Sequence, residues 1–167
     1  MQLPIVLVGP MGAGKTTLGK KLAKSLSVEF LDTDKLIAKD HGPITSVFEN
    51  LGEEAFREIE TNVLRHALSK DAVIATGGGI VLRDANRELL KNHRVIFLDS
   101  SAKHVLPKIN VEKRPLLKSN PDAWGEIYNQ RLPLYKEVAK ETLFTGGKPV
   151  SVALKELIEL AGKDSNE

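Results

Sequence analysis

The sequence predicts an α/β fold, in which helices flank a parallel β-sheet. Short β-branched or apolar runs alternate along the chain with longer segments of helical period, and this alternation is typical of βαβ units. A glycine-rich loop stands between the first apolar run and the first helical segment. A length of 167 residues suits one compact domain with its own core, so residues 1–167 are predicted to form a single domain.

Four apolar runs account for the predicted strands, at residues 5–8, 28–31, 72–75 and 94–98. Parallel strands are covered by helices on both faces, so they read as continuous apolar runs. The short length of each run also favours a strand over a helix.

Three longer segments carry apolar residues at helical spacing. Residues 15–26 are predicted to form a helix whose stripe consists of Leu18, Leu22, Ala23 and Leu26. A second helix is predicted near 53–69, with a stripe of Phe56, Ile59, Val63 and Ala67. A third is predicted over about 121–140, with a stripe of Trp124, Ile127, Tyr128, Leu132, Tyr135 and Val138. Pro133 lies inside this third helix and removes one backbone hydrogen bond.

The composition argues against several classes of protein. Lys plus Arg total 24 and Asp plus Glu total 22, without the basic run expected of a nucleic-acid-binding tail. The absence of cysteine excludes disulfides and thiolate metal sites, and it favours a reducing compartment, the cytoplasm. The apolar stretch at residues 3–8 is too short for a signal sequence or a membrane span. We expect a monomer that contacts neither membranes nor nucleic acids.

The stretch GPMGAGKT at residues 9–16 fits the phosphate-loop pattern G-x-x-x-x-G-K-[ST] through Gly9, Gly14, Lys15 and Thr16. Its glycines let successive N–H groups point at an anion, and the helix that follows adds partial positive charge. Lys15 supplies a full charge near the β- and γ-phosphates, and Thr16 offers a hydroxyl to Mg²⁺. The alternative is a glycine turn that only caps a helix. The strand before the loop and the helix after it favour a site for a nucleoside triphosphate with Mg²⁺.

Two carboxylates follow the second predicted strand, in Phe30-Leu31-Asp32-Thr33-Asp34. Ligands of open α/β sheets bind at this edge. In extended chain Asp32 and Asp34 would face the same side, where one serves hydrated Mg²⁺ and the other an acceptor hydroxyl. Alternatively, Asp32 or Thr33 only caps the next helix.

Two arginines are candidates for binding an anionic acceptor. Arg131 falls in the middle of the apolar stripe of the third helix, taking 100° per residue. A guanidinium buried there needs an anionic partner, unless the side chain reaches out to water. Arg57 lies at the border of its own stripe, and Glu60 lies one turn further on. Arg57 therefore either binds a ligand or forms an ion pair with Glu60. Two converging arginines suit a carboxylate.

Two loops complete the candidate site. Thr76-Gly77-Gly78-Gly79 directly follows the third strand; it either forms a plain turn or allows a ligand to approach the backbone. Arg114 lies in a polar, proline-containing stretch, residues 110–121, that is expected to act as a lid. There Arg114 is either a solvated charge or closes over the triphosphate.

The histidines and the single tryptophan are not expected in the site. The histidines have no metal-ligand spacing; they are His41, His66, His93 and His104. Trp124 adjoins the lid and is expected to pack structurally, with a fluorescence that reports lid closure.

Taken together, these motifs resemble the shikimate kinase family. GPMGAGKT, FLDTD, FREIE, TGGG, KRPLL and RLPLYKEVA occur in the family's order and at its spacing from Gly9 to Ala139. The resemblance implies the nucleoside monophosphate kinase fold, a five-stranded parallel sheet with a lid and a substrate-binding segment near residues 33–60. It also implies ATP-dependent phosphorylation of the 3-hydroxyl of shikimate, a step of chorismate and aromatic amino acid biosynthesis.

The resemblance also implies roles for individual residues. Lys15, Asp34 and Arg114 would be catalytic, and Asp34 would also contact shikimate hydroxyls. The shikimate carboxylate would lie between Arg57 and Arg131, beside the backbone of Gly77, Gly78 and Gly79. Mg²⁺ would be held by Thr16 and, through water, by Asp32. The nucleotide would contact Gly12, Ala13, Gly14, Lys15, Thr16, Thr17, Lys108 and Arg114.

One departure from the family pattern concerns the adenine contact. Many family members carry an arginine early in the lid region that stacks on adenine. Here the corresponding stretch is Val105-Leu106-Pro107-Lys108-Ile109, and Lys108 is the nearest cation. Because a lysine side chain has no planar surface, it cannot stack on the base as arginine does.

Two other functions compete with this interpretation. The first is another small-molecule kinase of the same fold, such as a gluconate or nucleoside monophosphate kinase, which would share the phosphate loop but not the other motifs. The second is a nucleotide switch that hydrolyses slowly. A switch would leave the inward-facing arginines without a ligand, and the chain has no N-K-x-D segment to read guanine.

Overall fold

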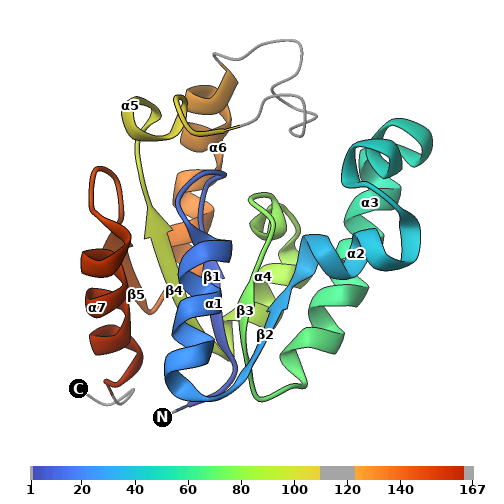
Figure 1. Ribbon diagram of the computed structural model, residues 1–167. Coiled ribbons are helices and arrows are strands. Elements are labelled where there is room, and N and C mark those ends of the chain that lie inside the picture. Colours follow the sequence, from blue (N-terminus) through green and yellow to red (C-terminus); the bar gives the residue numbers. More distant parts are fainter. Residues whose placement is uncertain (1, 110–122, 164–167) are drawn as a thin grey trace.

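The computed structural model describes residues 2–109 and 123–163. Its centre is a five-stranded parallel sheet in the order β2-β3-β1-β4-β5, as the resemblance implies. The strands are β1 (Ile5–Val8), β2 (Glu29–Asp32), β3 (Ala72–Ala75), β4 (Arg94–Asp99) and β5 (Glu141–Phe144). Figure 1 shows the sheet between two layers of helices, with both chain ends at the same end of the molecule.

The helices that surround the sheet follow the expected alternation with the strands. They are α1 (Lys15–Leu26), α2 (Thr33–His41), α3 (Ile44–Leu68), the 3₁₀ turn η1 (Ile80–Leu82), α4 (Asp84–Lys91), α5 (Ala102–Val105), α6 (Ala123–Val138) and α7 (Val150–Ala161). Across residues 2–109 and 123–163, none of these helices combines the length and the apolar character needed to cross a bilayer.

The alternation of side chains along β1 explains the three layers. Ile5 and Leu7 point into a core formed with α1 and α7. Val6 and Val8 point to the opposite face, into a core formed with α3, α4 and α6. All four residues are fully buried, which is why this strand reads as a continuous apolar run.

Most predicted boundaries agree with the structure within two residues, and two differences concern elements that border the site. The second strand lies one residue later than expected, because it ends on Asp32. The helix predicted near 53–69 extends back to Ile44 and is interrupted at Gly52, whose φ and ψ are 84° and 169°. The segment before Gly52 is held in place because Val47 packs with Ile37 and Phe56 in a separate small core.

The substrate-binding segment expected near 33–60 corresponds to α2 and the first part of α3. In Figure 1 these two helices lie on one side of the carboxyl ends of the strands, and α5 and α6 lie on the other. The lid expected at 110–121 lies outside the described residues.

Candidate active site

The phosphate loop connects the carboxyl end of β1 to the first turn of α1, as its sequence predicts. Lys15 is buried, and its Nζ donates hydrogen bonds to the carbonyls of Gly9 (2.6 Å) and Pro10 (2.9 Å). With these carbonyls occupied by the lysine, the ammonium group is held at the loop itself. Its charge therefore adds to that of the helix N-terminus, where an anion binds most favourably.

Two distant side chains fix further carbonyls of the same loop. Trp124 Nε1 donates to the carbonyl of Met11 at 3.0 Å, and Thr145 Oγ1 donates to the carbonyl of Ala13 at 2.7 Å. With the two bonds from Lys15, four carbonyl groups of the loop accept hydrogen bonds from side chains of the protein. Neither Trp124 nor Thr145 was predicted to contact this loop, because both are more than a hundred residues away in sequence.

Beside the loop lies a cavity of about 250 Å³, which we call the phosphate cavity. Its lining includes Lys15, Thr16 and Thr17 of α1 together with Asp32 and Asp34. Thr16 Oγ1 donates to Asp32 Oδ2 at 3.0 Å. A hydroxyl and a carboxylate thus lie together where the β- and γ-phosphates of a nucleotide would bind.

The expectation that Asp32 and Asp34 lie in extended chain is wrong. Asp32 ends β2 and its Oδ1 accepts hydrogen bonds from the N–H groups of Asp34 and Lys35, so it caps α2. This cap begins the helix immediately, and Asp34 lies in its first turn. Both carboxylates nevertheless line the phosphate cavity. From the sequence, a capping role and a role in the site are alternatives for Asp32. In the structure Asp32 both caps α2 and lines the phosphate cavity.

A larger cavity of about 420 Å³ adjoins the first, and we call it the acceptor cavity. It is bordered by α2, α3, α6 and the glycine segment after β3, and its lining consists of Met11, Asp34, Pro43, Ile44, Thr45, Phe48, Phe56, Arg57, Glu60, Gly77, Gly78, Gly79 and Arg131. Four of these residues also line the phosphate cavity: Met11, Asp34, Gly77 and Gly78. The two cavities therefore meet at Asp34 and the glycine segment.

Arg131 lines the acceptor cavity and is only 6% exposed. This excludes the alternative in which its side chain reaches out to water. Burial lowers the pKa of Arg131, and the nearby charge of Arg57 lowers it as well. Two guanidinium groups held close together in a dry environment favour an anion between them.

Arg57 is also 6% exposed, and it forms the ion pair with Glu60 that the sequence offered as an alternative. Its Nη1 donates to Glu60 Oε1 at 3.0 Å. The guanidinium also lies over the rings of Phe48 and Phe56, with its Cζ 5.8 and 5.0 Å from their centroids. Because Arg57 and Glu60 both line the cavity, the ion pair is part of the site rather than an alternative to it.

Glu60 is fully buried, and burial raises the pKa of its carboxyl to about 7, although Arg57 opposes this rise. Its Oε2 and the Nε of Arg57 are buried without a hydrogen-bond partner. The carboxyl is therefore easily protonated, and it neutralises the two arginines only in part. The cavity thus holds two guanidinium groups beside a carboxyl that burial drives toward its neutral form, and this environment suits an acidic ligand.

The glycine segment after β3 lies against these charged groups. A Cβ atom at Gly79 would lie 2.5 Å from Arg57 Nη1, and one at Gly77 would lie 2.8 Å from Asp34 Oδ1. The Tyr135 hydroxyl donates to the carbonyl of Gly78 at 2.6 Å and holds the segment in place. Glycine is needed at these positions because the charged side chains lie directly against the backbone, and all three glycines line the acceptor cavity.

A third cavity of about 200 Å³ extends from the other side of the phosphate loop, and we call it the outer cavity. It shares Gly12, Gly14 and Thr17 with the phosphate cavity. The rest of its lining consists of Ala13, Leu18, Ser100, His104, Lys108, Thr145, Gly146, Lys148, Val150 and Ala153. His104, which was not expected in the site, also lines this cavity. The side chain reaches the cavity because α5 packs on the loop, where a Cβ at Gly12 would lie 2.5 Å from Val105 Cγ1.

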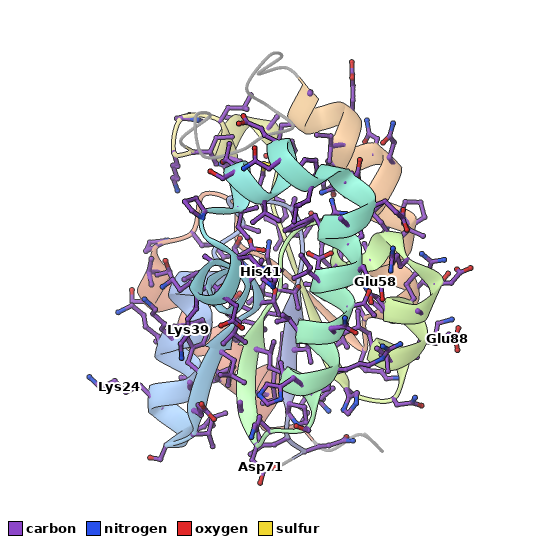
Figure 2. The ribbon with its side chains drawn as sticks, turned by 90° about the vertical axis from the view of Figure 1, so that its right-hand side faces the viewer. Lys24, Lys39, His41, Glu58, Asp71 and Glu88 are labelled. Carbon is purple, nitrogen blue, oxygen red and sulfur yellow. The ribbon has the colours of Figure 1, made fainter. Side chains whose placement is uncertain are left out.

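Most predicted site residues are thus brought together around three adjoining cavities. Arg114 lies outside the described residues, so its role stays a prediction. Three other charged residues of α3 lie away from the cavities, at the protein surface: Glu54, Glu58 and Arg65. Figure 2 shows Glu58 at the surface of α3, where it pairs with Arg83 at 2.7 Å. Within the described part of the chain, no three His, Cys, Asp or Glu side chains gather as a metal site would require.

Sequence reasoning missed the apolar wall of the acceptor cavity. Phe48 and Ile44 precede the Gly52 interruption and carry no motif. Their role follows only from how α2 and α3 fold against each other. Glu60, by contrast, carried a usable signal, because its spacing from Arg57 placed both on one edge of the helix.

Comparisons with known proteins agree with this geometry. The family model for shikimate kinase matches residues 11–161. A shikimate kinase of Pseudomonas aeruginosa (strain LESB58) is 42% identical over 164 residues, covering 93% of this chain and 94% of the relative. A solved structure of shikimate kinase from Acinetobacter baumannii in complex with shikimate is 40% identical, with a TM-score of 0.89 and coverage of 94% of this chain and 91% of that chain.

A gluconokinase from Sinorhizobium meliloti 1021 has a TM-score of 0.58 at 16% identity and covers 94% of this chain and 90% of that chain. At this low identity the likeness shows the fold alone. The chain belongs to the shikimate kinase family.

Proposed function

We propose that this protein transfers the γ-phosphoryl group of ATP to the 3-hydroxyl of shikimate, giving shikimate 3-phosphate and ADP in the pathway to chorismate and the aromatic amino acids. The observation that carries the proposal is the junction of the two cavities. Buried Arg57 and Arg131 line the acceptor cavity, which meets the phosphate cavity at Asp34. A cyclic carboxylic acid bound there through its carboxylate has its hydroxyls directed toward the phosphate loop.

Asp34 is the proposed contact for the acceptor hydroxyl, because it lines both cavities. The shikimate oxygen attacks the γ-phosphorus, the bond from this phosphorus to the β–γ bridging oxygen breaks, and the hydroxyl proton is released. Lys15 offsets the charge that develops on the phosphates, with Arg114 assigned the same task from the sequence. Catalysis then consists mainly of positioning and electrostatic stabilisation.

The nucleotide is proposed to bind with its phosphates over Gly12, Ala13, Gly14, Lys15 and Thr16, beside Thr17. The nucleoside then extends into the outer cavity, where Lys108 was expected to contact it. Shikimate is proposed to bind between Arg57 and Arg131, with Gly77, Gly78 and Gly79 at its side. Phe48 and Phe56 give the cavity an apolar wall suited to a carbon ring.

Mg²⁺ is the proposed cofactor. The hydroxyl of Thr16 and a carboxylate oxygen of Asp32 lie 3.0 Å apart at the phosphate cavity, and Mg²⁺ prefers oxygen ligands. We assign Thr16 as a direct ligand and Asp32 as a ligand through water. When bound, the ion neutralises charge on the β- and γ-phosphates. We further propose a monomer that acts in the cytoplasm.

The test is nucleotide consumption by the purified protein in the presence of Mg²⁺, with and without shikimate. ADP formation is expected to depend strongly on shikimate and not to respond to gluconate. Phosphorus NMR of the product is expected to show a phosphate ester at the 3-position. Hydrolysis at the same rate without shikimate would favour a nucleotide switch, and a response to gluconate would favour the other kinase.

A further inference from the structure

The outer cavity has a feature that the proposed function leaves unassigned. It joins the phosphate cavity through Gly12, Gly14 and Thr17, so a nucleotide with its phosphates on the loop directs its base into it. Among the described residues that line this cavity, His104 carries the only aromatic ring. The outer and acceptor cavities have no lining residue in common.

The backbone around His104 makes room for its ring. Gly146 and Gly147 follow β5, and a Cβ atom at Gly146 would lie 2.7 Å from His104 Cδ2. One at Gly147 would lie 2.9 Å from His104 Cε1. Any other residue at these two positions would displace the ring, so the loop after β5 holds the imidazole where it lines the cavity.

Two further contacts restrain the position of His104. The ring of Phe144 meets it edge-on, with centroids 6.3 Å apart and an interplanar angle of 75°, a favourable arrangement for two aromatic rings. Its backbone N–H donates to the carbonyl of Ser101 at 3.0 Å in the first turn of α5. Val105, the next residue, packs against Gly12 of the phosphate loop. The imidazole is therefore held at a fixed place relative to the phosphate loop.

Lys108 lines the same cavity but is suited to another task. Its side chain is exposed, and a flexible ammonium stem offers no flat surface to a base. An imidazole ring offers such a surface, and stacking is the contact that purine bases favour most readily.

We infer that His104 is the residue on which the purine base of the nucleotide stacks. The inference rests on the proposed function, since it concerns the nucleotide of that reaction. His104 binds the base without touching the reacting atoms, so it sets nucleotide affinity and not the chemical step.

The experiment compares two probes that differ in whether they carry a base. Binding of MgADP and of magnesium tripolyphosphate is measured by calorimetry for the wild type, His104→Ala and His104→Phe. His104→Ala is expected to weaken MgADP binding about tenfold and to leave tripolyphosphate binding within about twofold. His104→Phe, which keeps a ring, is expected to bind MgADP within about threefold of the wild type.

Lys103→Ala is the matched control, because Lys103 lies beside His104 on α5, is exposed and does not line the cavity. It is expected to bind both probes normally. Unchanged MgADP binding in His104→Ala would overturn the inference. An equal loss of affinity for MgADP and for tripolyphosphate would also overturn it, because it would indicate a structural role. If Lys108→Ala weakened MgADP binding and His104→Ala did not, the base would be assigned to the lysine instead.

Shikimate binding reports on folding, because the acceptor cavity is lined by other residues. His104→Ala is expected to bind shikimate normally, and His104→Phe provides the test if the alanine variant fails to fold. Failure of the proposed function is recognised separately. It would appear as shikimate-independent ADP formation by the wild type, whatever the histidine variants bind.

Discussion

Arg131 occupies a position where an aliphatic side chain would be less costly for folding. It lies on the buried face of α6 and is 6% exposed, and burial lowers its pKa. A charge in such a place is destabilising unless a partner compensates it. We therefore attribute its presence to ligand binding rather than to stability.

Replacement of Arg131 by methionine is expected to separate these two roles. Methionine keeps most of the volume and removes the charge, so shikimate binding should weaken about 30-fold or more. The melting temperature should stay equal or rise, because a buried cation is removed. Calorimetry with shikimate and thermal unfolding measure the two effects. Arg65→Met, at an exposed position of α3, is the control, and normal shikimate affinity of the Arg131 variant would remove this residue from the site.

Glu60 gives the stability of the protein a dependence on pH. Because burial raises the pKa of its carboxyl from 4.5 to about 7, the folded state holds a proton that the unfolded state has lost between these two values. The free energy of unfolding therefore falls as the pH rises through this window. The side chain of Glu60→Gln does not titrate. The melting temperature of this variant minus that of the wild type should therefore increase by about 5 °C between pH 5 and pH 8. Parallel curves for the two proteins would contradict the assignment.

Lys15 is expected to act on the chemical step. Its Nζ lies at the phosphate loop, bonded to Gly9 and Pro10, and it is not among the residues that line the acceptor cavity. Lys15→Met should lower kcat about 100-fold or more, with shikimate affinity nearly unchanged. Steady-state kinetics and shikimate calorimetry test this. Lys24→Met, on an exposed side of the same helix (Figure 2), should behave as wild type. A near-normal kcat in Lys15→Met would refute the role.

At the scale of elements, the loop after β5 supports the phosphate loop. Thr145 Oγ1 donates to the carbonyl of Ala13 at 2.7 Å and lies 3.1 Å from that of Asp99. This side chain thus ties β4, β5 and the phosphate loop together. Because Thr145 pairs the carbonyl of Ala13, the conformation of the phosphate loop is fixed before phosphate binds. The N–H groups of the loop can then bind phosphate at little reorganisation cost.

Thr145→Val keeps the shape of the side chain but removes the donor. The KM for ATP should rise about fivefold, and magnesium tripolyphosphate should bind more weakly as well, unlike the result expected for His104→Ala. The KM for shikimate should stay within about twofold of the wild type. Thr142→Val, at an exposed position of β5, is the control. Equal KM values for ATP in both variants would show that the hydrogen bond has no influence on nucleotide binding.

The elements that sequence could predict are those with strong local patterns. The strands β1 and β3 were predicted to the residue because all their side chains are buried. The position of β5 could not be predicted, because this edge strand buries only Leu143. The helix α7 was also missed, although Ala153, Leu157 and Ala161 are spaced four residues apart on its buried face. That stripe is a signal that could have been used.

At the scale of the molecule, Trp124 connects the first turn of α6 to the phosphate loop. It is 3% exposed, it is stacked on Tyr128 with centroids 5.1 Å apart, and its Nε1 donates to Met11. Met11 in turn lines both the phosphate and acceptor cavities. A change in the phosphate loop therefore reaches the only tryptophan of the chain.

The intrinsic fluorescence of Trp124 is expected to change when MgATP binds, because the hydrogen bond to Met11 senses the loop. Iodide should quench the free protein poorly, since the ring is buried. A fluorescence titration with MgATP measures the effect, and Lys24→Met should give the wild-type signal. A flat signal in a protein that binds MgATP by calorimetry would contradict the coupling.

A residue of the candidate site could be predicted from the sequence only where it belongs to a motif or departs from a local pattern. The phosphate loop has a motif, and Arg131 interrupts an apolar stripe, so both were identified from the sequence. His104 has no such mark, because its place depends on glycines 42 and 43 residues further along the chain, at Gly146 and Gly147. Phe48 depends in the same way on how α2 meets α3.

The shared border of the acceptor and phosphate cavities has a practical consequence for inhibitor chemistry. Because Asp34, Gly77 and Gly78 belong to both, no wall of protein separates the two ligands. A single molecule that fuses a cyclic carboxylic acid directly to a polyphosphate chain can therefore fill both spaces. Such a conjugate loses its translational freedom once rather than twice, so its affinity is expected to exceed that of either fragment by orders of magnitude.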